Sequence, residues 1–150
     1  MAVTLEIPNE YGYVLLTVVS TAFVNLWHGM QTSAARKTSG IGYPNAYATP
    51  EQAEKNPEAY RLNCAQRAHA NFTENLVPFL PTLLIAGLRY PVPAAAAGAG
   101  WLVSRIVYTK GYTSNAGPKG RMAGSLAGYL CYLPLIGMAG YTAFQISQGN

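Results

Sequence analysis

The chain has 150 residues, enough for one domain, and half of them are apolar. Only 11% of the residues are charged, well below the roughly 25% that is usual in soluble domains. The excess of four positive charges is scattered along the chain, so no nucleic-acid partner is expected. Together with abundant glycine and tyrosine, this composition favours a helical membrane protein.

Long apolar segments predict four membrane helices within a single domain, 1–150. The first, over about 11–35, contains an uncharged run from Tyr11 to Met30 apart from His28, long enough to cross a hydrocarbon core of about 30 Å. A proline-containing loop follows at 36–58, with a short helix expected from Pro50. The other helices are expected over about 58–88, 93–112 and 121–145, joined by a short loop at 113–120. The predicted fold is an all-α integral membrane four-helix bundle.

Small residues mark the last helix as a packing helix. Four glycines lie at spacings typical of close contacts between membrane helices: Gly124, Gly128, Gly137 and Gly140. We expect all four to give neighbouring helices room to approach.

Basic residues are distributed unevenly between the two sides of the expected membrane. Seven of them lie in or beside the first and third loops: Arg36, Lys37, Lys55, Arg61, Lys110, Lys119 and Arg121. The other side has Arg89, and neither terminal segment contains Lys or Arg. The positive-inside rule therefore places loops 36–58 and 113–120 in the cytosol and both termini on the opposite side.

A polar stripe begins the second long helix. Arg67, Asn71 and Glu74 are spaced i, i+4 and i+7, which places them within roughly 40° of one another on one helix face. Charged side chains are costly in an apolar helix unless they face a partner, a cavity or a polar ligand. The topology puts this stripe at the cytosolic edge of the membrane.

Further polar residues converge on the same edge. They are the cations and phenols that end the first and third helices and begin the fourth: Arg36, Lys37, Arg105, Tyr108, Tyr112, Lys119 and Arg121. A pocket rich in cations that also holds one carboxylate suits a small zwitterionic ligand with more carboxylates than amines.

Each part of this arrangement has a purely structural alternative. Arg67 and Glu74 could form an ion pair that ties helices together. Tyr108 and Tyr112 could be aromatic residues of the membrane interface, and the basic residues could act as topology determinants alone. His69 points roughly 200° away from Arg67, which favours a packing or subunit-contact role.

The segment from Asn63 to Glu74 contains Arg67-Ala-His-Ala-Asn-Phe-Thr-Glu74 and resembles the Arg-x-x-x-Asn-x-x-Glu motif of the MAPEG family. These are membrane-associated proteins of eicosanoid and glutathione metabolism. Similar segments at Glu10–Thr17, Ala35–Lys37, Arg105–Tyr112 and Arg121–Ser125 extend the resemblance over almost the whole chain. Together they look like the branch of the type-three microsomal glutathione S-transferase.

The resemblance implies a homotrimer that binds glutathione between adjacent subunits. It implies that the tripeptide is held by seven side chains: Arg36, Arg67, His69, Asn71, Glu74, Tyr108 and Tyr112. Arg36 would come from the neighbouring subunit, and His69 would act across the interface. Asn75 stands where leukotriene-forming relatives have tyrosine, so one family contact is missing.

The resemblance also implies that an arginine at the start of the last helix activates the glutathione thiol. Alignment of the following Gly-Ser selects Arg121, whereas counting from Tyr112 selects Lys119; we favour Arg121 and keep Lys119 as the alternative. A thiol with a pKa near ~8.5 is mostly protonated at neutral pH, and a cation within ~4 Å lowers that pKa. No metal is implied.

These features predict a membrane glutathione transferase with glutathione-dependent lipid peroxidase activity. Its second substrate would be a hydrophobic electrophile or lipid hydroperoxide arriving from the membrane lipid, past residues such as Trp101, Leu102 and Leu126. We expect the endoplasmic reticulum, with lumenal termini, or alternatively the outer mitochondrial membrane. A non-enzymatic lipid-presenting scaffold and a small channel or transporter subunit are the alternative functions.

Overall fold

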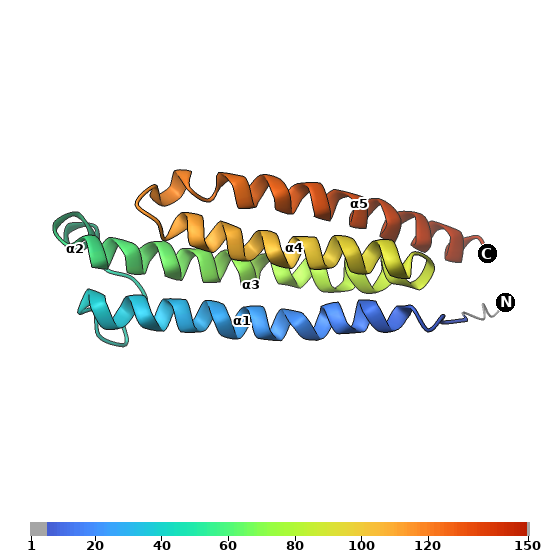
Figure 1. Ribbon diagram of the computed structural model, residues 1–150, viewed down its shortest axis with the longest axis horizontal. Coiled ribbons are helices and arrows are strands. Elements are labelled where there is room, and N and C mark those ends of the chain that lie inside the picture. Colours follow the sequence, from blue (N-terminus) through green and yellow to red (C-terminus); the bar gives the residue numbers. More distant parts are fainter. Residues whose placement is uncertain (1–5, 150) are drawn as a thin grey trace.

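The structure is a computed structural model that describes residues 6–149. It contains four long helices, α1 (Tyr11–Ser39), α3 (Pro57–Arg89), α4 (Pro91–Tyr112) and α5 (Met122–Ser147). A short helix α2 (Pro50–Lys55) precedes α3, and a 3₁₀ turn η1 (Gly117–Lys119) precedes α5. The long helices run side by side, with both chain ends at one end of the molecule and α2 near the other (Figure 1).

The first helix is longer than the sequence predicts. It continues past residue 35 to Ser39, so Arg36 and Lys37 lie in its last turn and not in the loop. Gly40 ends the helix with φ at 72°, a left-handed conformation that glycine adopts without a steric penalty. Basic residues in this last turn also complement the negative end of the helix dipole.

Capping and proline residues set the next boundaries. The short helix expected from Pro50 is confirmed: Thr49 and Gln52 form a reciprocal capping box at its start. Asn56 caps α3, whose first residue is Pro57. Tyr90 is the single residue between α3 and α4, because Pro91 already begins the next helix, two residues before the predicted start.

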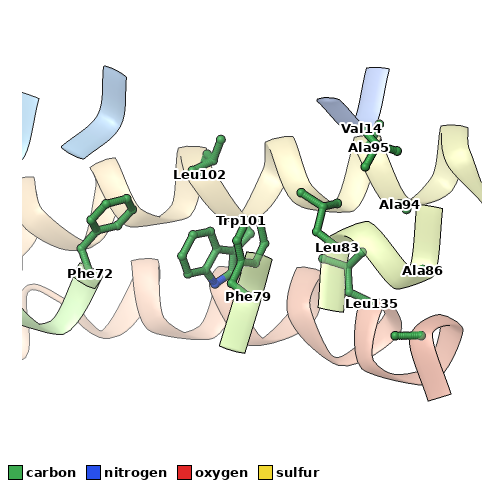
Figure 2. Close-up of a cluster of buried hydrophobic side chains, with 11 residues drawn as sticks. Val14, Phe72, Phe79, Leu83, Ala86, Ala94, Ala95, Trp101, Leu102 and Leu135 are labelled. Atoms are coloured by element: carbon green, nitrogen blue, oxygen red, sulfur yellow. The ribbon is translucent and has the colours of Figure 1, made fainter. Parts of the chain in front are cut away.

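The core lies where α3, α4 and α5 pack together, with α1 against α3 and α4. Phe79 and Trp101 stack with ring centroids 3.8 Å apart, and Leu83 and Leu135 are fully buried beside them (Figure 2). Trp101 and Leu102 are 3% and 5% exposed, so their expected contact with lipid is wrong. Because α4 is apolar on most sides, periodicity could not separate its buried face from its outer face.

Outward-facing apolar side chains cover α1 and α5. Two segments are long and apolar enough to cross a membrane, Tyr11–Ser39 and Gly117–Ser147, and only 28% and 22% of the residues in their most apolar windows are buried. Exposed large side chains on them include Leu16, Phe23, Met30, Leu126, Leu130 and Leu133. Such continuous apolar surfaces need cover from lipid or from another protein surface.

Close packing of α4 against α5 depends on two of the four glycines. A Cβ atom at Gly124 would collide with the backbone of Tyr108, and one at Gly128 would lie 3.0 Å from the Ser104 hydroxyl oxygen. Gly137 and Gly140 have no such neighbour within 4 Å, so the expectation of a packing role is not met for them in the single chain. The approach at Gly124 brings the start of α5 against Tyr108.

We therefore predict that Gly124→Ala destabilises the protein by about 1–3 kcal/mol, because the added methyl group must push α4 and α5 apart. Gly140→Ala is the matched control, since it adds the same methyl group to the same helix in open space. Thermal unfolding in detergent checks the pair. Equal unfolding temperatures for the two variants would contradict the assigned contact.

Candidate functional site

A polar cavity of about 160 Å³ opens between α3, α4 and α5. Its lining residues come from all three helices: Asn71, Asn75, Trp101, Arg105, Tyr108, Arg121, Ser125, Gly128, Tyr129 and Tyr132. It thus brings together four of the polar residues singled out from the sequence: Asn71, Arg105, Tyr108 and Arg121.

Arg105 is a buried cation on the wall of this cavity. It is 6% exposed, and one Nη atom donates a hydrogen bond to the Asn71 side-chain oxygen. Its guanidinium carbon lies 4.3 Å from the centroid of the Tyr108 ring, while its Nε has no hydrogen-bond partner. Within residues 6–149 the one ion pair closer than 4.0 Å is elsewhere, so no carboxylate neutralises Arg105.

A second cation, Arg121, reaches the same cavity from the start of α5. Its Nη1 donates a hydrogen bond of 3.0 Å to the Tyr108 hydroxyl oxygen, and its guanidinium carbon lies 5.4 Å from the Tyr112 ring centroid. The phenol of Tyr108 therefore contacts both guanidinium groups. Lys119 is exposed on η1 and does not line the cavity.

Arg67 and Glu74 form a two-pronged ion pair along one face of α3. Their N–O distances are 2.8 and 3.2 Å, and the side chains are 46% and 53% exposed. Both residues belong to the same helix, so the pair cannot tie two helices together as the structural alternative supposed. Both groups remain open to a ligand from outside.

The polar stripe of α3 is divided between two hollows. Asn71 faces the cavity between the three helices, whereas Arg67 lines a neighbouring hollow of about 260 Å³. Tyr112 lines that second hollow and also lies near Arg121. An extended ligand that spans both hollows would have cations on each side of it.

Arg36 is engaged in its own chain. Its guanidinium donates hydrogen bonds to the backbone carbonyls of Ile41, Asn45 and Ala46, and it lies 4.6 Å from the Tyr43 ring centroid. It therefore holds the loop after α1 in place. It lines neither of the two hollows.

His69 packs toward α1, as its angle on the helix predicts. Its Nε2 lies 3.0 Å from the Asn25 side-chain oxygen, and its ring stacks on that of His28 with centroids 5.7 Å apart. A packing role within the chain is therefore confirmed. Contact with a ligand across a subunit interface stays a prediction.

The α5 side of the cavity escaped the sequence reasoning. Ser125, Tyr129 and Tyr132 follow Arg121 at helical spacing and line the same wall, together with Asn75 from α3. A search for a polar stripe continuing from Arg121 along the otherwise uncharged helix could have found them.

The exposure of the Arg67–Glu74 pair predicts that it stabilises the fold little. Glu74→Gln should lower the free energy of unfolding by less than about 1 kcal/mol, because solvent-exposed ion pairs contribute at most this much. Thermal unfolding of purified Glu74→Gln beside wild type checks this value. A decrease in the free energy of unfolding well above this value would show that the ion pair has a structural role.

Comparison with known proteins agrees with the motif and its surroundings. The MAPEG family model matches residues 14–141, which include every residue that lines the polar cavity. Members of this family are membrane glutathione transferases or related enzymes. The chain therefore belongs to the MAPEG family, and it is a membrane protein.

Proposed function

We propose that this protein is a membrane glutathione transferase with glutathione-dependent lipid peroxidase activity. The observation that carries the proposal is the polar cavity with two arginines, Arg105 and Arg121, and no carboxylate among the described residues to neutralise them. Glutathione has two carboxylates, one ammonium group and a thiol. It therefore brings the negative charge that this site lacks.

The two hollows suit the two ends of the tripeptide. Arg67 and Tyr112 would bind one part of the peptide, and Glu74 would pair with its ammonium group. Asn71, fixed by Arg105, would bind a backbone amide or carboxylate. Tyr108, which contacts both guanidinium groups, would contact the cysteine portion of glutathione.

Arg121 is the proposed thiol-activating cation. Tyr108 holds its guanidinium at the cavity, where it would stabilise a thiolate and lower the thiol pKa. The thiolate attacks an electrophilic carbon and forms a C–S bond as the leaving group departs. With a hydroperoxide it attacks the outer oxygen, the O–O bond breaks, and the alkoxide takes a proton; a second glutathione then reduces the sulfenic product to the disulfide and water.

We further propose an integral membrane four-helix bundle that assembles as a homotrimer. The apolar outer faces of α1 and α5 offer surface for lipid and for neighbouring subunits. Arg36 and His69, which reach neither hollow within one chain, would then contribute from an adjacent subunit. The distribution of basic residues supports a topology with cytosolic loops 36–58 and 113–120. The endoplasmic reticulum is proposed from the resemblance to microsomal relatives.

One prediction decides whether Arg121 or Lys119 activates the thiol. Arg121→Ala should lower kcat for both conjugation and peroxide reduction by about 100-fold, because a single charge-stabilising group in an active site contributes on that scale. Glutathione affinity should fall far less. Lys119→Ala, the matched control on the exposed 3₁₀ turn, should keep the wild-type kcat, and the reverse pattern would assign the thiol to Lys119.

Another prediction uses glutathione binding to distinguish an enzyme from a scaffold or a channel subunit. Equilibrium dialysis of the purified protein with labelled glutathione should show saturable binding that Glu74→Gln weakens about tenfold, because an ion pair to the ligand is lost. S-methylglutathione, which cannot ionise at sulfur, should still bind. Absence of saturable binding to wild type would discard the transferase proposal.

A further inference from the structure

We propose that His28 is a positioning residue that holds the Asn71–Tyr108 wall of the cavity from behind; as a role in glutathione binding, this rests on the proposed function. His28 lies on α1, which contributes no residue to the cavity. It is 1% exposed in an apolar interior, where a polar ring is retained only with a compensating contact.

One contact joins His28 to α4. Its Nδ1 lies 3.3 Å from the Thr109 hydroxyl oxygen, and both side chains are 1% exposed. Thr109 directly follows Tyr108, the residue that contacts both cavity arginines. The hydrogen bond therefore fixes the rotation and depth of the α4 turn that presents the phenol.

A second contact joins His28 to α3. Its ring stacks on Phe72 at a centroid distance of 4.7 Å and an interplanar angle of 16°. Phe72 is fully buried and directly follows Asn71, whose amide faces the cavity. The His28 imidazole thus contacts the residue that follows Asn71 on α3 and the residue that follows Tyr108 on α4. It supports both of these cavity walls from the side of α1.

The other neighbours of the His28 ring leave Thr109 as its hydrogen-bond partner. His69 stacks on it from α3, with its own Nε2 bound to Asn25 of α1. The Nε2 of His28 itself has no partner, so Thr109 is the one hydrogen-bond partner of the ring among the described residues. Losing that partner would uncouple the imidazole from α4 and leave the α4 turn free to shift.

The test uses matched variants of the hydrogen bond. Thr109→Val removes the hydroxyl with little change of volume, Thr109→Ser restores it, and His28→Phe keeps an aromatic ring but no Nδ1. We expect Thr109→Val and His28→Phe to raise the Kd for glutathione about fivefold, the scale of one buried hydrogen bond. Their double variant should be no worse than either one, because both remove the same interaction.

Thr109→Ser should keep the wild-type Kd, as should Thr32→Val. Thr32 is another buried threonine, one turn after His28 on α1, and its hydroxyl donates to the backbone carbonyl of His28 and not to the imidazole ring. A wild-type Kd in both Thr109→Val and His28→Phe would overturn the proposal, and so would an equal loss in Thr32→Val. If His28→Phe fails to fold, the Val and Ser variants at Thr109 decide the question.

A readout without glutathione separates this proposal from the proposed function. Incorporated 3-fluorotyrosine gives a Tyr108 resonance that is identified by its loss in Tyr108→Phe. His28→Phe should shift and broaden this resonance, whereas Thr32→Val should leave it unchanged. If wild type binds no glutathione, the transferase proposal fails but the shift still supports the positioning role; an unshifted resonance overturns that role in either case.

Discussion

The site depends on a buried positive charge, that of Arg105, which has no carboxylate partner within residues 6–149. Arg105 is almost fully buried, yet its polar and cation–π contacts are one carboxamide and two aromatic rings, those of Trp101 and Tyr108. Burying an unpaired ion costs several kcal/mol, and neither aromatic faces nor a single amide replaces a counter-ion fully. The cavity next to Arg105 is therefore prepared for an anionic group, and Arg121 adds a second cation at its rim.

The rest of the fold keeps these two cations at a fixed separation. Gly124 lets α5 touch the backbone of α4 at Tyr108, which places Arg121 within hydrogen-bond reach of the phenol. On the opposite side, His28 supports the same turn of α4 through Thr109. Tyr108 is thus held by α5 and, through Thr109, by α1, and its position determines where a bound thiol would meet the guanidinium of Arg121.

Much of this arrangement was predictable from the sequence, for physical reasons that differ by element. Uncharged length revealed α1 and α5, and the i, i+4, i+7 spacing placed the polar stripe of α3 on one face. Spacing could not tell that Arg67 pairs with Glu74 outside while Asn71 turns inward, because that depends on where α4 packs. Nor could it show that Trp101 is buried, since α4 is apolar nearly all round, or that Arg36 is occupied by carbonyls of its own loop.

The most direct test of the account is a structure of the protein in lipid nanodiscs with glutathione bound. We predict that the sulfur lies within about 4 Å of the Arg121 guanidinium, with the peptide extending past Asn71 toward Arg67. Glutathione bound away from the Arg105 cavity, or with its sulfur beside Lys119, would contradict the account.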